Sequence, residues 1–451
     1  MLARFLYAAY KRGYVFTRWR KRHVTPPGVT LVAISVLAGI FGVNIFKTSL
    51  YQIMAAGVSV MAVSLLGSVV PFRLKVRIHR ILPDYATCGD PVTYEIDITN
   101  LSSKPQKGLI LYEDIQDPRP DFETLLSKRE PFEHLRNAWD KNTLYYRWLW
   151  LLQKNQKARF RQVSLPDLPA GGTTRVTAGF IPRYRGYVHF SGVTFARPDV
   201  MGLFCRLFQI KKAQTVLVLP KRYLLAPPDL LSTRHYHPGG IRLASSIGDS
   251  DEFMSLRQYR PGDPLRNIHW RTFAKTNELV IKEFEDEYFV RHALILDTFS
   301  PPGNERIFEA AVSIASSYIA SLQIHESILD LMFVGNLSYS FSSGRGLAHS
   351  GKMLELMACV EPCEDKTIFE LVPALQASIK KISCSICVFL GWDAGHKKIY
   401  QMFKQFRVKA FIIVVAVDKL KMEQKMVQEL TATDRITVVE IGQIQETLGA
   451  E

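Results

Sequence analysis

Acidic residues are missing from the first 82 positions of this 451-residue chain. Twelve lysines and arginines lie there, so this segment accounts for 12 of the 15 net positive charges and leaves +3 for the rest of the chain. A charge of +15 spread over the whole surface would indicate a nucleic-acid-binding protein. Because the charge is confined to one end, we expect no nucleic-acid partner for the body of the protein.

Several motifs that would define an enzyme are also missing from the sequence. It contains no Walker A loop, which excludes a P-loop ATPase, and neither an HExxH pair nor a GxSxG elbow. Cysteine is scarce, with six residues. Cys384 and Cys387 have the CxxC spacing of a zinc site, but they lie in or beside an apolar strand, so we predict buried, free thiols. The sequence therefore predicts a protein that is not an enzyme.

Two long apolar runs, 28–46 and 50–70, follow the basic N-terminus. Each is close to the roughly 20 residues that a helix needs to cross a bilayer core, and only three residues separate them. Seven bases precede the first run and four follow the second, so the positive-inside rule places both chain ends in the cytoplasm. We predict a basic cytoplasmic segment at 1–27 and a transmembrane helical hairpin at 28–72.

Residues 73–220 have the texture of a β-sandwich. The segment 93–99 alternates polar and apolar residues, with Tyr94, Ile96 and Ile98 on one face. Short strands are expected at 108–112, 174–180, 186–190 and 192–195, separated by glycine and proline turns. Strands of this length and spacing are typical of a small, immunoglobulin-like sandwich.

An insertion at 113–165 interrupts the sandwich pattern. Aromatic residues gather at 145–150, and four bases follow at 154–161. Three interpretations stay open: a long hairpin whose aromatic side chains fill the sandwich, an element lying on lipid headgroups, or a surface at 141–161 that stacks single-stranded nucleic acid.

The C-terminal region, 290–451, alternates apolar strands with amphipathic helices. Strands are expected at 293–297, 328–334, 386–390, 410–417 and 436–441, with helices between them. This alternation predicts a doubly wound, mainly parallel sheet covered on both faces. A linker rich in proline, glycine and serine at 221–252 separates it from the sandwich, together with a block at 253–289.

The block at 253–289 has the densest pattern in the chain. Arg260-Pro261-Gly262-Asp263-Pro264 cannot be helical, and an acidic strand is expected at 279–287. Its bases and acids balance, which favours an internal salt-bridge web or a docking face over a nucleic-acid groove. The residues that we assign to this docking signature are Tyr259, Arg260, Gly262, Asp263, Pro264, Arg266, His269, Trp270, Arg271, Glu283 and Glu285.

This block resembles the signature of the prokaryotic family called domain of unknown function 58. The match comprises residues 259–266, 268–271 and 283–285, and segments 185–187 and 199–204 are similar to the family's strand–turn signatures, with Val200 where proline is usual. The resemblance implies a C-terminal domain like the von Willebrand factor A fold. It also implies partnership with a MoxR-type AAA+ ATPase.

Domains of that type hold Mg²⁺ at the carboxyl ends of their strands, through an Asp-x-Ser-x-Ser loop and further oxygen ligands. Asp297, Ser300, Thr367 and Asp393 occupy comparable places here. The loop departs from the pattern, because Phe299 and Pro301 stand at the two serine positions. Mg²⁺ is thus a possible cofactor that the resemblance implies, in a degenerate site.

These observations predict an adaptor or scaffold in the bacterial inner membrane, with its mass in the cytoplasm. It would work with a MoxR-type ATPase, and with other maturation factors for membrane or secreted proteins, in protein maturation or quality control. Two alternatives are a metal-dependent hydrolase that uses Asp297 and a nucleic-acid-binding protein that uses 141–161.

Overall fold

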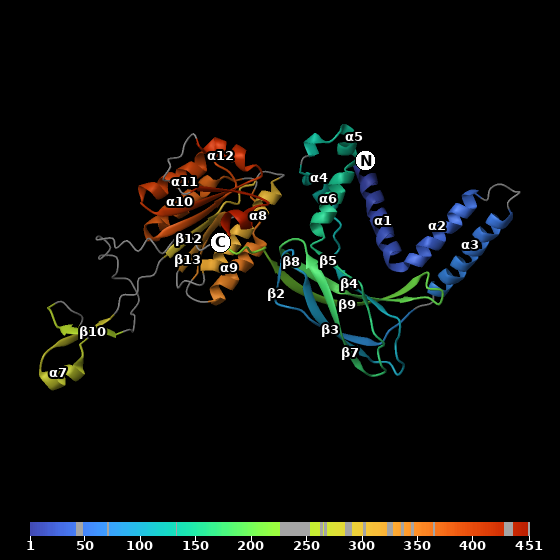
Figure 1. The fold of residues 1–451 in the computed structure, drawn as a ribbon, viewed down its shortest axis with the longest axis horizontal. Coiled ribbons are helices and arrows are strands. Elements are labelled where there is room, and N and C mark those ends of the chain that lie inside the picture. Colours follow the sequence, from blue (N-terminus) through green and yellow to red (C-terminus); the bar gives the residue numbers. More distant parts are fainter. Residues whose placement is uncertain are drawn as a thin grey trace. The chain divides into compact units, whose positions relative to one another are not determined.

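The computed structural model describes the chain except residues 42–47, 70–71, 132, 226–252, 262–264, 266–267, 285–290, 301–303, 323–327, 335–337, 344–346, 364–365, 428–435 and 450–451. The chain forms two compact units (Figure 1). Unit 1 comprises Met1–Tyr223, Thr298–Ser317 and Gly351–Lys366, and unit 2 comprises Leu224–Asp297, Tyr318–Ser350 and Thr367–Glu451. The linker predicted at 221–252 lies mostly outside the described residues.

Unit 1 begins with three helices, α1 (Leu2–His23), α2 (Pro26–Phe41) and α3 (Thr48–Val69). The segment Ser49–Ser68 is long and apolar enough to cross a membrane, whereas α2 is apolar but shorter. The basic N-terminal segment, for which no structure was predicted, is thus a helix of 22 residues. It ends at Val24, and Pro26 begins α2, since proline suits the first turn of a helix.

Helices α2 and α3 pack against each other through small residues. Ser35 and Ala38 are buried on α2, and Gly57 is buried on α3. Gly28 and Ser64 are buried as well, next to Leu203 and Asp199 in the turn 199–204. A Cβ atom at Gly57 would lie only 2.2 Å from Ser35 Oγ, so the helices approach at a distance that only glycine allows. The large aliphatic residues point outward instead, among them Ile34, Leu37, Ile40, Val58, Val63 and Leu66.

The insertion between β4 (Ile110–Ile115) and β5 (Ala158–Phe160) is helical. It contains α4 (Phe122–Ser127), the 3₁₀ turn η1 (Glu133–Leu135), α5 (Ala138–Thr143) and α6 (Tyr145–Asn155). Leu125, Trp148 and Leu151 form a cluster of their own, and Tyr7, Tyr10 and Tyr14 of α1 pack on it. Tyr10 Oη also donates a hydrogen bond to Thr143 O (2.8 Å).

One interpretation of the insertion is corrected by this packing. The prediction of a hairpin filling the sandwich is wrong, because the segment is helical and Trp148 is buried against α1, outside the sandwich core. Trp148 is also unavailable for base stacking, since α1 covers it.

The sandwich has two sheets. The first has the order β1-β3-β7-β5 and contains β1 (Val76–Ile81), β3 (Val92–Asn100), β7 (Thr173–Pro182) and β5 (Ala158–Phe160). The second has the order β2-β9-β8-β4-β6 and contains β2 (Tyr85–Thr87), β9 (Cys205–Leu219), β8 (Gly186–Pro198), β4 (Ile110–Ile115) and β6 (Val163–Ser164).

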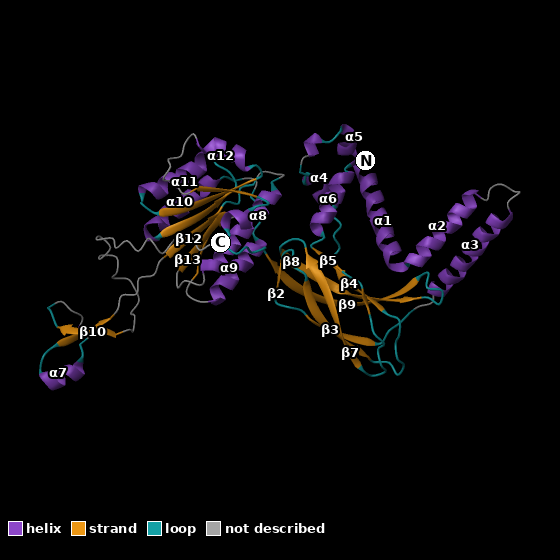
Figure 2. Cartoon of the chain, viewed as in Figure 1, coloured by secondary structure: helices purple, strands orange, loops and turns teal. Residues whose placement is uncertain are grey.

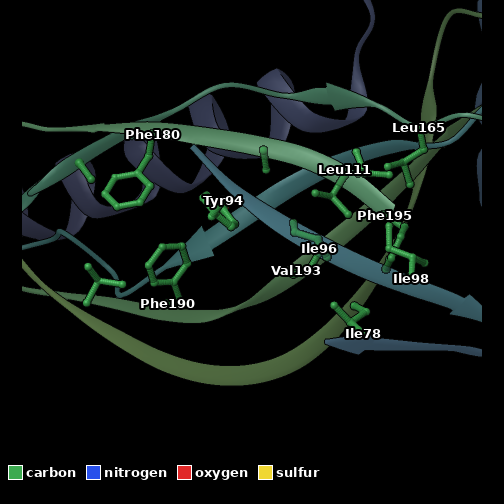
Figure 3. Packing of buried hydrophobic residues seen from close by; sticks show 14 of the residues in the cluster. Ile78, Tyr94, Ile96, Ile98, Leu111, Leu165, Phe180, Phe190, Val193 and Phe195 are labelled. Carbon is green, nitrogen blue, oxygen red and sulfur yellow. The ribbon is translucent and has the colours of Figure 1, made fainter. Parts of the chain in front are cut away.

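The predicted alternation in β3 is confirmed, because Tyr94, Ile96 and Ile98 all point into the core (Figure 3). They meet Phe180 from the same sheet and Phe190 from the other, so one apolar layer joins both sheets.

The two short strands expected at 186–190 and 192–195 are one long strand, β8. Its register with β9 shifts between Phe190 and Gly192. A Cβ atom at Gly192 would lie 2.3 Å from Ile210 O. This glycine therefore lets β8 and β9 approach closely at the register shift and does not mark a turn.

A fully buried ion pair lies within this core. Arg80 Nη2 donates to Glu113 Oε2 (2.9 Å), and Arg80 Nη1 donates to Gln214 Oε1 (2.7 Å). Tyr94 Oη donates to Glu113 Oε1 (2.8 Å), and the Arg80 guanidinium lies 5.0 Å from the Phe190 ring centroid. Burial raises the pKa of Glu113, against the influence of Arg80 and of the hydrogen bonds. The charge of Glu113 thus depends on Arg80.

Unit 2 contains a six-stranded sheet of order β14-β13-β12-β15-β16-β17 (Figure 2). Its strands are β14 (Ser338–Ser343), β13 (Ile328–Val334), β12 (Arg291–Leu296), β15 (Cys384–Phe389), β16 (Lys409–Ala416) and β17 (Ile436–Glu440). The pairs are parallel except β13–β14. Every residue of β15 is buried, as predicted for a strand covered on both faces.

The remaining helices alternate with these strands along the chain. They are α8 (Glu305–Leu322), α9 (Leu347–Cys359), α10 (Leu371–Ser378) between the 3₁₀ turns η6 (Ile368–Glu370) and η7 (Ile379–Lys381), α11 (Ala394–Gln405), α12 (Lys419–Val427) and α13 (Ile444–Leu448). The predicted alternation of strands and helices is confirmed.

We expect Arg80→Met to destabilise the sandwich by about 3–5 kcal/mol, because it leaves the Glu113 carboxylate buried without its cation. The midpoint of urea unfolding of the detergent-solubilised chain measures this loss. Adding Glu113→Gln should restore part of it, since the orphaned charge is then gone. Arg175→Met, which removes an exposed ion pair with Asp97, should change the midpoint little. Equal midpoints for the two single variants would contradict this role of Arg80.

Candidate functional site

The signature block folds as a small hairpin within unit 2. Strands β10 (Phe253–Gln258) and β11 (Val280–Phe284) pair antiparallel, and α7 (Trp270–Thr276) lies between them in sequence. Ile268 and Ile281, joined by an isolated bridge, are buried. Of the signature residues, Gly262, Asp263, Pro264, Arg266 and Glu285 lie outside the described residues.

Backbone contacts bring Tyr259 and His269 to one end of this hairpin, whereas Glu283 pairs with Ser255 toward the other end. Tyr259 N donates to Leu279 O (2.9 Å), and His269 N donates to Val280 O (2.9 Å). The His269 Nδ1 atom lies 2.5 Å from Thr272 Oγ1, within the first turn of α7. Asn277 ends the helix in the left-handed conformation, with φ 54°. These hydrogen bonds hold the backbone and the ring of His269 in place at the start of α7.

The hairpin presents large apolar side chains outward. Leu265 is 65% exposed and Trp270 is 61% exposed, and Leu256 and Leu279 are exposed as well. Arg260 and Arg271 also have exposed side chains. An exposed tryptophan next to an arginine in sequence is the composition typical of interface centres.

A second group of polar side chains lies in the six-stranded sheet, at its switch point. Strand β12 connects to β13 on one side and lies beside β15 on the other, so the chain connections diverge there. Asp297 directly follows β12, and Asp393 follows β15. The carboxyl ends of parallel strands at such a point are where α/β sheets bind ligands.

His396 joins these two carboxylates. Its Nε2 atom lies 2.9 Å from Asp297 Oδ2, and its Nδ1 atom lies 2.7 Å from Asp393 Oδ1. Asp297 Oδ2 also accepts a hydrogen bond from Leu390 N (2.9 Å), and Asp393 caps α11 by accepting from Gly395 N (2.8 Å). Asp297 and His396 are both buried.

The surroundings of His396 favour its charged form. Burial works against the charge, but the hydrogen bond to Asp297 and the charges of Asp297 and Asp393 outweigh burial, so the pKa of His396 is raised above 6.5. When Nδ1 is protonated it donates to Asp393 Oδ1 (2.7 Å), and when it is unprotonated it accepts from Asp393 N (3.2 Å). The charged ring, with both nitrogens protonated, bridges the two acids.

The side chains as arranged do not suit Mg²⁺. The His396 ring lies between Asp297 and Asp393, and a hard cation prefers oxygen ligands to an imidazole nitrogen. Among the described residues, no group of three or more His, Cys, Asp and Glu side chains is placed to hold a metal ion. Thr367 begins η6, and Ser300 is buried with its N–H directed at Thr298 O (3.1 Å).

Sequence reasoning placed Asp297 and Asp393 correctly at the strand ends and missed His396. The Asp393-x-x-His396 spacing, which matches a helix capping box, was the available signal. Asp297 belongs to a hydrogen-bond network through its contacts with His396 and Leu390.

The cysteines are free thiols, as predicted. Cys384 and Cys387 lie within β15 and are buried. Burial raises the pKa of each to about 12, so both are protonated thiols at neutral pH.

Residues 255–429 match the model of the family described as "Protein of unknown function DUF58". The matched segment starts in the signature hairpin and continues through most of the α/β sheet, so the chain carries this family's domain and the resemblance seen in the sequence is confirmed. A Bacillus subtilis (strain 168) protein, described as "Uncharacterized protein YeaD", is 29% identical over 178 residues. That match covers 39% of this chain and 42% of the relative, less than half of either.

Two solved structures resemble parts of the chain weakly. The CARDB domain of a Pyrococcus furiosus protein has 13% identity and a TM-score of 0.18, and the match covers 34% of this chain and 95% of that one. A C-terminal portion of native alpha-2-macroglobulin from Escherichia coli has 11% identity and a TM-score of 0.19, with coverage of 37% and 22%. Scores this low carry no argument about the fold.

We expect the His396 bridge to stabilise unit 2 at low pH and to lose its effect as pH rises. Because the folded pKa is raised, the stabilisation is complete below 6.5 and disappears as pH passes through the folded pKa. Relative to His396→Gln, the wild type should be more stable by about 1–3 kcal/mol at pH 6 and by much less at pH 9.

Urea unfolding at pH 6 and at pH 9 measures this difference. The fraction of chains in which Cys384 and Cys387 are exposed is read by a brief thiol-labelling pulse, always at the same pH. His189→Gln is the matched control, because His189 is exposed. A difference between wild type and His396→Gln that grows with pH would contradict the charged bridge.

Proposed function

We propose that the protein is a membrane-anchored adaptor whose signature hairpin docks a partner protein on the cytoplasmic side of a bacterial inner membrane. The observation that carries this proposal is the exposure of Leu265 and Trp270 on a small, separately paired hairpin. Large apolar side chains cost free energy in water, and contiguous ones on a surface mark interaction sites.

The membrane anchor is supported by the packing of α2 and α3. Their buried positions hold glycine, serine and alanine, and their outward positions hold isoleucine, leucine and valine. A soluble helical pair would bury the large residues and expose the small polar ones. The observed arrangement is the one that lipid-exposed helices adopt, since small residues permit close packing where no hydrophobic effect drives association.

The flanking charges support a two-span anchor with both ends in the cytoplasm. The seven bases of α1 precede α2, and Arg73, Lys75, Arg77 and Arg80 follow α3. In this topology the sandwich and the α/β sheet both lie on the cytoplasmic side.

The proposed kinship of the C-terminal domain with the von Willebrand factor A fold is supported by its sheet. Five neighbouring strands are parallel, and one antiparallel strand, β14, closes an edge. On this proposal the Asp297–His396–Asp393 group lies where such domains bind ligands, with an imidazolium in place of a metal ion.

The partner that the family resemblance favours is a MoxR-type AAA+ ATPase, and the process is the maturation or quality control of other proteins. A hairpin that combines an exposed tryptophan with arginines suits a partner surface that has an apolar pocket and acidic residues around it.

The adaptor proposal predicts that Trp270→Ala weakens capture of a co-expressed MoxR-type ATPase by roughly thirtyfold, the loss expected when a central tryptophan of about 2 kcal/mol is removed. Affinity purification of the tagged full-length chain from detergent-solubilised membranes measures the captured ATPase.

Trp139→Ala is the matched control, because Trp139 is 77% exposed on α5, far from the hairpin in sequence. It should retain wild-type capture. Unchanged capture by Trp270→Ala, or an equal loss in both variants, would refute docking through the hairpin.

A further inference from the structure

We propose that a cavity between the C-terminal half of α1 and the sandwich binds the phosphate of an anionic phospholipid headgroup. The inference rests on the proposed membrane anchor and adds a ligand to it. The cavity has a volume of about 290 Å³ and is lined by Arg18, Trp19, Arg22 and His23 of α1, together with Arg119 and Leu207. This volume is near the lower end of ligand pockets, so it suits a headgroup and not a whole lipid.

The charges around the cavity leave a positive excess. Arg22 pairs with Asp114 at 2.6 Å, and Arg18 lies 3.6 Å from the same carboxylate. Arg119 Nε donates to both oxygens of Asp117 (2.9 and 2.7 Å). Three arginines therefore face two carboxylates, and burial lowers the pKa of His23, which keeps that ring neutral at pH 7.

The arginines are held in place and still have donors to offer. Asp114 is buried, and it accepts hydrogen bonds from Thr194 Oγ1 (2.5 Å) and Gln209 Nε2 (3.0 Å), so it fixes the position of Arg22. A guanidinium has five N–H donors, and the contacts of Arg119 with Asp117 use only its Nε and Nη2. Arginine forks of this kind recognise phosphate oxygens.

The rim of the cavity identifies a lipid as the source of that phosphate. Phe16 is exposed and stacks on Trp19 (6.1 Å between centroids), and Trp19 stacks on His23 (5.0 Å). Pro26, three residues beyond His23, begins α2. An aromatic rim beside the start of a membrane helix lies at the level of the headgroups, where acyl chains can follow the outer faces of Phe16 and α2.

Lipid binding to the full-length chain in detergent tests the proposal. Native mass spectrometry counts the lipid molecules retained as phosphatidylglycerol or phosphatidylcholine is titrated, with and without inorganic phosphate. We expect the wild type to prefer phosphatidylglycerol. The variant Arg18→Gln/Arg119→Gln should weaken this binding roughly tenfold, since it removes two charge-assisted donor groups.

The matched control is Arg12→Gln/Arg20→Gln, which also removes two positive charges, both from residues of α1 that do not line the cavity. It should change the affinity less than about twofold. Circular dichroism shows whether both double variants are folded. Equal losses in the two variants, no preference for phosphatidylglycerol, or complete displacement by inorganic phosphate would overturn the lipid site. A chain that stays in solution without detergent would instead overturn the anchor itself.

Discussion

The arrangement of unit 1 depends on the contact between the turn Asp199–Phe204 and the ends of the apolar helices α2 and α3. Thr25 N, between α1 and α2, donates to Leu203 O (3.0 Å), and a Cβ atom at Gly28 would lie 2.4 Å from that oxygen. Asp199 accepts from the backbone of Leu203 (2.8 Å) and from Ser64 of α3. Burial works against the charge of Asp199, but these hydrogen bonds outweigh it and lower its pKa. The Asp199 carboxylate thus connects α3 to the sandwich through hydrogen bonds on both sides. Breaking these bonds costs free energy, because it leaves the carboxylate without its donors.

The strands and helices that depend on local periodicity could be predicted from the sequence. The inward face of β3 follows from its alternation of apolar and polar residues, and the buried strands β15 and β16 follow from their continuous apolar runs. Helix α1 was missed, although Tyr7, Tyr10 and Tyr14 have helical spacing, because the bases around them dominate the pattern. The tyrosine face of α1 is buried only because α6 packs against it, and no local sequence pattern specifies a contact between segments so far apart in the chain.

The candidate site shows the same division between local and distant information. The signature hairpin could be located from its turn residues and charges, but the exposure of Trp270 depends on which side of the hairpin is covered. Asp297 and Asp393 could be placed at strand ends. Their link through His396 depends on β12 and β15 being neighbours, and strand order is a property of the whole sheet. The His396 ring lies between the two carboxylates that the resemblance offered as possible Mg²⁺ ligands, and an imidazolium can satisfy both with its own N–H groups.

The central claim is that an outward-facing apolar helical pair holds the rest of the chain on the cytoplasmic side of a membrane. Cys359 is exposed in α9, and no cysteine precedes Cys88 in the sequence. Labelling of the full-length chain by a membrane-impermeant maleimide, with Cys359→Ser as the background, therefore reports the side on which the body lies. We predict labelling of Cys359 only after intact cells are permeabilised. Equal labelling of Cys359 before and after permeabilisation would contradict the account.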